Sequence, residues 1–267
     1  MLFSEVLHTL KPADGAWSAE LPAGWAQGRT VFGGLQAAIA VRAMRELVPA
    51  QVPLRVLQTT FVAPVPPGTV RIEARVLRTG KSVTHVEARL LADGQTGCLV
   101  VGIFGAARES QIQVALRREP LAVKPEQAIL ARYIEGLMPA FTQHVTMRWA
   151  GGKPPFSGAA EPKTQIYVDL KEPFAGQGPA AEYQIIGYAD IIPSPGVSML
   201  KKPAMASSLT WTLELLADRF DAAPDGPWLM DAEVSSGRDG YLSQSAVLWT
   251  PQWQAAALSR QSVVAFG

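Results

Sequence analysis

The sequence has few of the residues that carry metal, redox or disulfide chemistry. Its 267 residues include a single cysteine, Cys98, which excludes a disulfide within the chain and a zinc site built on cysteines. Cys98 lies in an apolar run, so we interpret it as a buried structural thiol. The three histidines, His8, His85 and His144, are far apart and match neither an HExxH zinc motif nor a Ser-His-Asp arrangement. The residues therefore predict no metal site.

An excess of charge of one sign and a long apolar run are also missing. The chain carries 24 basic and 23 acidic residues, a formal net charge of +1, which argues against nucleic acid as a main partner. No segment has the apolar length needed to cross a bilayer, and the N-terminus lacks the pattern of a signal peptide. With 48% hydrophobic residues the chain can bury a sizeable core. We therefore expect a cytoplasmic protein without a membrane span.

What the sequence does contain is one pattern that occurs twice. An apolar helix is predicted at residues 34–48, and a second helix follows at about 180–192. Two β-type runs, at 141–149 and 165–170, precede the second helix. Four further runs follow each helix, separated by glycine- and proline-rich turns that favour hairpins. These strands are expected at 54–62, 69–78, 83–92 and 97–106, and again at 208–216, 228–235, 241–250 and 255–266.

An apolar helix followed by an antiparallel meander is an α+β pattern. Its recurrence divides the chain into an N-terminal unit at residues 1–107 and a C-terminal unit at 139–267. The charged stretch between them, at 108–138, is interpreted as a linker. We expect the two units to superpose as similar helix-in-sheet structures rather than to share one doubly wound parallel sheet.

Asp190 is the most informative polar residue. In the predicted second helix, Tyr183, Ile186, Gly187 and Asp190 fall on one face, so the carboxylate is set into a largely buried helix. Such a carboxylate costs stability unless it is hydrogen-bonded, and residues of this kind are often functional. The residues themselves support equally an aspartate at a helix end that is hydrogen-bonded to the following loop.

Four other residues carry weaker signals. Gly33 and Gly34 open the first helix, where they let a ligand approach the backbone N–H groups of a helix N-terminus. On the residues alone, a tight packed turn before the helix is the favoured interpretation. Ser208 begins a predicted strand and Gln261 interrupts the last one, and polar strand residues usually face solvent. Composition and periodicity do not join these residues into a site.

The chain resembles the type II acyl-CoA thioesterases and the wider thioesterase-like superfamily of double hot-dog proteins. Val31-Phe32-Gly33-Gly34, before a helix of small residues, is similar to the start of the family's first helix. Gly187-Tyr188-Ala189-Asp190 is similar to the segment that carries the family's catalytic aspartate. Ser208-Leu209 resembles the strand with its catalytic serine or threonine, and Gln261 falls where the last strand carries its catalytic glutamine.

This resemblance implies a fold of two tandem hot-dog units, each a long central helix wrapped by an antiparallel sheet. It implies hydrolysis of acyl-CoA to a free acid and CoA, with a water held by Asp190, Ser208 and Gln261 and with Gly33 and Gly34 binding substrate. It implies neither a metal nor a redox cofactor. We expect a homo-oligomer, a dimer or larger.

Two positions depart from the family's pattern. Thr210 stands where the family usually has an aspartate, and Glu214 stands near a position that often carries a histidine. These departures leave open a protein that binds acyl thioesters without turning them over. A hot-dog hydratase acting on enoyl or hydroxyacyl thioesters is disfavoured, because such enzymes rely on a histidine near the hot-dog helix and neither predicted helix contains one.

Overall fold

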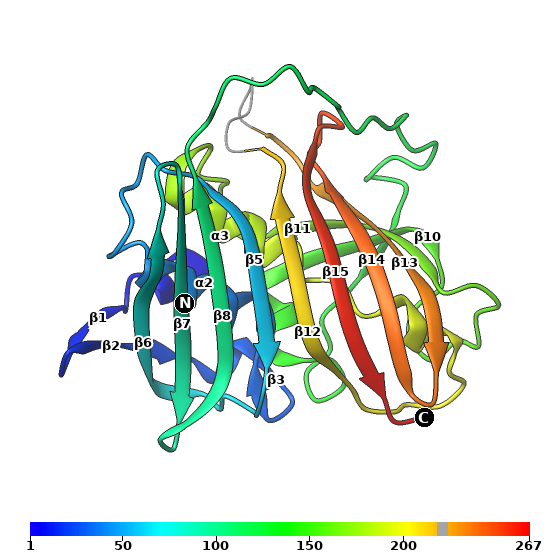
Figure 1. The fold of residues 1–267 in the computed structure, drawn as a ribbon. Helices are drawn as coiled ribbons and strands as arrows, with labels where there is room; N and C mark the ends of the chain where they lie inside the picture. Colours follow the sequence, from blue (N-terminus) through cyan, green and yellow to red (C-terminus); the bar gives the residue numbers. More distant parts are fainter. Residues whose placement is uncertain (218–223) are drawn as a thin grey trace.

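The computed structural model describes residues 1–217 and 224–267 (Figure 1). In these ranges, thirteen strands form one continuous sheet in the order β1-β2-β6-β7-β8-β5-β12-β15-β14-β13-β11-β10-β9, and β3 and β4 form a separate pair. Neighbouring strands are antiparallel. The two predicted units therefore share a single sheet, joined where β5 lies beside β12.

The first half of the sheet comes from the first part of the chain. Its strands are β1 (Lys11–Ala13), β2 (Ala16–Leu21), β5 (Leu54–Phe61), β6 (Gly68–Thr79), β7 (Val83–Ala92) and β8 (Gln95–Gly105). The short strands β3 (Ala26–Gln27) and β4 (Thr30–Val31) precede helix α2 (Gly33–Met44), and helix α1 (Phe3–Leu7) lies at the N-terminus. The four long strands match the predicted runs within two residues at each end.

The second half repeats this order. Strands β9 (Ile129–Ala131), β10 (Val145–Gly152) and β11 (Lys163–Leu170) precede helix α3 (Gly178–Tyr188). After it come β12 (Ala206–Leu215), β13 (Trp228–Arg238), β14 (Tyr241–Trp249) and β15 (Ala255–Ala265). The order β11-β13-β14-β15-β12 mirrors β2-β6-β7-β8-β5 across the junction of β5 and β12. The predicted repeat of one helix and four following strands is confirmed.

Both helices lie on the same side of the sheet, behind it in the view of Figure 1. Helix α2 packs against α3 and against β6, β7 and β8, and most of its residues are buried. This environment explains a helix that is apolar nearly all round, since all its residues except Gly33 and Arg42 are buried. One core cluster joins both helices to the inner face of the sheet.

Three details of the structure differ from the expectations or add to them. Helices α2 and α3 have 12 and 11 residues, an ordinary length for a globular protein, so long central helices are not confirmed. The predicted strand at 141–149 begins as a 3₁₀ turn, η2 (Ala140–His144). Strand β9 lies within the stretch interpreted as a linker and adds an edge strand beside β10. The boundaries at 107 and 139 stay a prediction. Within the described ranges no helix is long and apolar enough to cross a membrane.

Candidate active site

Three of the predicted site residues meet in one hydrogen-bonded chain. The side-chain Nε2 of Gln261 donates to Oδ1 of Asp190 at 2.8 Å. The hydroxyl of Ser208 donates to Oε1 of Gln261 at 3.0 Å. Because a glutamine amide has both donors and an acceptor, Gln261 links a residue that accepts to one that donates. The three residues come from the turn after α3, from β12 and from β15.

The sheet register places Ser208 beside Gln261. Strands β12 and β15 are paired so that Trp211 stands opposite Gln261, and a β-bulge between Ser208 and Thr210 interrupts the pairing. A bulge changes which face the following residues point to, and it allows Ser208 to reach the inner face that Trp211 also occupies. Gln261 is itself 7% exposed, so a polar amide is placed within the core.

Asp190 does not lie in the helix, contrary to the prediction of a helix to residue 192. Helix α3 ends at Tyr188, and Asp190 follows in a turn. The N–H of Asp190 donates to the carbonyl of Gly187, and that of Ile191 donates to the carbonyl of Tyr188. These bonds span three residues and tighten the last turn, which ends the helix. The carboxylate consequently points past the helix end toward α2.

The predicted Gly33 and Gly34 face this carboxylate from the N-terminus of α2. The N–H of Gly34 donates to Asp190. A Cβ placed on Gly33 would lie 2.8 Å from Oδ2 of Asp190, closer than real Cβ atoms approach other groups, and 3.0 Å from the ring of Phe61. Glycine at the start of α2 is thus required for the carboxylate to approach the helix N-terminus. All five residues predicted for the site are together.

Burial sets the acidity of Asp190. The residue as a whole is partly exposed, but its carboxylate is enclosed, and loss of hydration raises the pKa of Asp190 to about 6. The hydrogen bonds from Gln261 and from the Gly34 N–H favour the ionised form and oppose part of this rise. A carboxylate with this pKa is ionised at neutral pH and is a stronger base than an aspartate in water.

The two departures from the family pattern lie on the other face of the sheet. Thr210 and Glu214 are exposed, whereas Trp211 and Leu213 between them are buried. Alternate residues of a strand point to opposite faces, so neither departure faces Asp190. The unusual residues therefore leave the hydrogen-bonded chain unaffected.

One residue of this network is absent from the sequence prediction. Gln244, on β14, stands opposite Gln261 and donates from Nε2 to Oε1 of Gln261 at 3.3 Å. The alternation of Gln244, Ala246 and Leu248 within a predicted strand could have placed it on the inner face. Nothing in the sequence indicates that Gln244 forms a hydrogen bond with Gln261.

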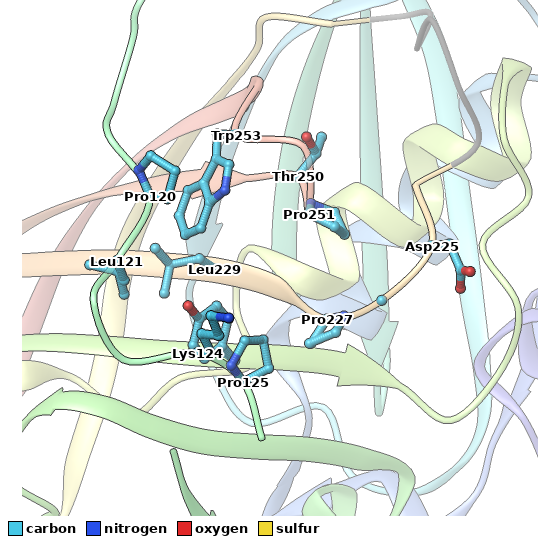
Figure 2. Close-up of a pocket in the computed structure, with 12 residues that line it drawn as sticks. Pro120, Leu121, Lys124, Pro125, Asp225, Pro227, Leu229, Thr250, Pro251 and Trp253 are labelled. Atoms are coloured by element: carbon cyan, nitrogen blue, oxygen red, sulfur yellow. The ribbon is translucent and has the colours of Figure 1, made fainter. Parts of the chain in front are cut away.

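A separate cavity of about 330 Å³ lies on the outer face of the sheet (Figure 2). Its lining includes Tyr167, and Figure 2 shows Pro120, Leu229 and Trp253 around it. Tyr167 alternates along β11 with Ile166 and Val168, which belong to the core beneath the helices. The cavity is therefore on the opposite face from Asp190, and we do not assign it to the candidate active site.

Comparison with known protein families identifies both halves of the chain. Residues 21–124 match the model of the acyl-CoA thioesterase N-terminal domain, and residues 119–265 match that of the acyl-CoA thioesterase C-terminal domain. A search of curated proteins gave no match.

Solved structures with the same fold cover nearly the whole chain. A conserved hot-dog protein of unknown function from Alicyclobacillus acidocaldarius has a TM-score of 0.84 and 20% identity over 99% of this chain and 98% of its own. The tesB protein of Mycobacterium avium subspecies paratuberculosis has a TM-score of 0.78 and 13% identity over 100% of both chains. An acyl-CoA thioesterase II, TesB2, from Mycobacterium marinum has a TM-score of 0.73 and 14% identity over 99% and 96%. At these identities the likeness shows the hot-dog fold, and the match to the family models shows the family: the chain belongs to the acyl-CoA thioesterase family.

Proposed function

We propose that the protein hydrolyses acyl-CoA thioesters to a free acid and CoA. The observation that carries this proposal is the continuous chain from Asp190 through Gln261 to Ser208, set at the N-terminus of α2. It combines a buried base, two orienting side chains and the positive end of a helix dipole within one site. The family and the fold agree with this chemistry.

The attacking water would donate a hydrogen bond to Asp190 and accept one from the second N–H of Gln261. The Ser208 hydroxyl donates to Gln261, so its lone pairs remain to accept from the same water. As the water oxygen bonds to the thioester carbon, its proton passes to Asp190. The C–S bond then breaks, and the proton that Asp190 holds neutralises the departing CoA thiolate.

The negative charge that develops on the carbonyl oxygen needs a donor. The first N–H groups of a helix have no partner within the helix, and the N–H of Gly34 already donates to Asp190. We assign the N–H of Gly33 to the oxyanion, because Gly33 is the first residue of α2 and lies against the base. This arrangement brings the carbonyl carbon close to a water held by Asp190.

The main alternative is a family member that binds acyl thioesters without hydrolysing them. Thr210 and Glu214 motivated it, and their position on the exposed face removes that support. The proposed mechanism itself uses neither residue.

Release of CoA thiol from a panel of acyl-CoAs tests the proposal, with each assay repeated in EDTA. We expect hydrolysis of at least one chain-length class at an unchanged rate in EDTA, because the mechanism uses protein groups only. Complete loss in EDTA that a divalent ion restores would refute the mechanism, and absence of thiol release across the panel would refute the function. The cytoplasmic location and the homo-oligomer stay predictions, the second of which light scattering can measure.

A further inference from the structure

Gln244 occupies a position where the fold does not require a polar residue. Within the described chain, the β5–β8 pairing has a bulge between Leu54 and Val56, as the β12–β15 pairing has between Ser208 and Thr210. Aligning the halves on these bulges matches Leu54 with Ser208 and sets Gly102 in the place of Gln261.

The residue opposite Gly102 on β7 is Val86, just as the residue opposite Gln261 on β14 is Gln244. Val86 is fully buried and packs in the core. The related half of the same sheet therefore accepts a valine where the second half has a glutamine. Packing alone would favour the apolar residue here.

Keeping a glutamine at this position is costly for the fold. Gln244 is 8% exposed, and its Oε1 is buried without a hydrogen-bond partner among the described residues. A buried acceptor that lacks a partner loses its hydration without compensation. In the described residues, the side chain of Gln244 forms its hydrogen bond through the amide nitrogen, which donates to Oε1 of Gln261.

That bond bears on the orientation of the Gln261 amide. Because an ionised carboxylate only accepts hydrogen bonds, Asp190 requires the nitrogen of Gln261 to face it. Oε1 then needs donors on its other side. The Ser208 hydroxyl supplies one of these donors. A second donor from Gln244 strengthens the orientation in which Gln261 donates to Asp190, since linked hydrogen bonds polarise one another.

We propose that Gln244 is a positioning residue that holds the side-chain amide of Gln261 with its nitrogen toward Asp190. It acts through Gln261 and does not touch the substrate. The expected effect on kcat rests on the proposed function. The orientation of the Gln261 amide rests on the hydrogen-bond geometry alone.

The test replaces Gln244 by the residue that the first half uses. Gln244→Val is made in the wild-type protein and in Gln261→Ala. Thr164→Val is the control, because it removes another buried polar group without a partner in the described residues, the Thr164 hydroxyl. We expect Gln244→Val to lower kcat roughly three- to tenfold, the worth of one hydrogen bond, with little change in KM. In the Gln261→Ala background it should have no further effect. The thermal midpoint should be unchanged or higher, as for Thr164→Val, which should keep full kcat.

An equal loss of kcat in both backgrounds, or no loss in the wild-type background, would overturn the proposal. If the wild-type protein releases no thiol from any acyl-CoA, the proposed function fails and a second readout decides on Gln244. The side-chain amide signals of Gln261 in a ¹H–¹⁵N spectrum, assigned by their absence in Gln261→Ala, should shift and broaden in Gln244→Val. Identical signals in the two proteins would show that Gln244 does not hold the amide.

Discussion

The two ends of the α2–α3 pair have similar architecture, but the charged residue that follows the helix is acidic at one end and basic at the other. At one end, Asp190 follows α3 and reaches the start of α2, where the N–H of Gly34 donates to it. At the other end, Arg45 follows α2 and reaches Glu182 in α3. Each end thus has a charged residue just after one helix that contacts the early part of the other.

The strand residues beneath these two ends also differ in polarity. Under Asp190 the row of matched strand positions is Ser208, Gln261 and Gln244, and all three side chains are polar. In the other half the corresponding row is Leu54, Gly102 and Val86, which offers no side-chain hydrogen bond. The space above Gly102 is filled by Met44, whose Sδ lies 2.7 Å from where a Cβ would be.

The Arg45 end is closed by an ion pair. The side chains of Arg45 and Glu182 are 4% and 7% exposed, and Arg45 also donates to the carbonyl of Val52. Glu182 accepts in addition from the N–H of Leu54. The charges satisfy one another and leave no base for catalysis. One scaffold thus supports two similar ends: one is closed by an ion pair between Arg45 and Glu182, and at the other the Asp190 carboxylate has no cation as partner among the hydrogen bonds described.

Replacing the carboxylate should have the largest effect on turnover. Asp190→Asn is nearly isosteric but removes the proton acceptor, so kcat should fall about 10²- to 10⁴-fold with the fold intact. Asp169→Asn is the matched control. Burial also raises the pKa of Asp169 to about 6, but its partner is the hydroxyl of Tyr188 at 3.2 Å. Thiol release should be retained in that control, and full turnover in a folded Asp190→Asn protein would end the assignment.

Breaking the closed end should affect stability instead. Arg45→Met leaves the Glu182 carboxylate buried without its cation, which costs about 3–5 kcal/mol for a pair of this kind. The thermal midpoint should fall clearly while kcat per folded molecule stays close to that of the wild type. Adding Glu182→Leu removes the uncompensated charge and should recover part of the loss. A strong fall in kcat without loss of stability would show that this end takes part in the reaction.

A methyl group added at each end sharpens the comparison. Gly33→Ala brings a Cβ against Oδ2 of Asp190 and the ring of Phe61, so the carboxylate or the helix must shift. A displacement of about 1 Å can lower kcat by about 10²-fold. Gly102→Ala meets first the Sδ of Met44, the end of a flexible side chain, and should leave kcat nearly unchanged. Equal effects on kcat from the two substitutions would contradict the difference between the ends.

The smallest expected effect is the dependence of stability on pH. Because the pKa of Asp190 is raised to about 6, the folded protein binds this proton more tightly than the unfolded chain. Asp190 therefore contributes less to stability as pH rises from about 4 through 6, by on the order of 1–2 kcal/mol. Asp190→Asn lacks this dependence, so its thermal midpoint relative to the wild type should rise between pH 4 and pH 7. The raised pKa of Asp169 is present in both proteins and cancels in the difference.

The activity of the wild-type protein provides the companion measurement. kcat/KM should fall tenfold per pH unit below about pH 6, where Asp190 becomes protonated. A constant midpoint difference, together with flat kcat/KM across this range, would mean that Asp190 does not titrate near pH 6.

Local signals predicted the long strands well and the short ones poorly. The run at 83–92 coincides with β7, and the Asp93-Gly94 turn after it has the positive φ angles, 51° and 75°, that aspartate and glycine tolerate in hairpins. Strands β1, β2 and β9 were missed. They have six residues or fewer and lie at or near the two edges of the sheet, where few neighbours impose a hydrophobic alternation.

The sequence by itself determined the repeat, the apolar helices and the antiparallel hairpins, because each depends on residues close together in the chain. The residues of the site were found through resemblance to a family. Tertiary structure alone decided that they meet, since Asp190 and Gln261 are 71 positions apart and Ser208 and Gln261 are 53 apart. Their meeting depends on the β12–β15 register, on the bulge at Ser208 and on where α3 ends. The periodicity of the sequence predicts none of these three features, because each results from how separate elements pack together.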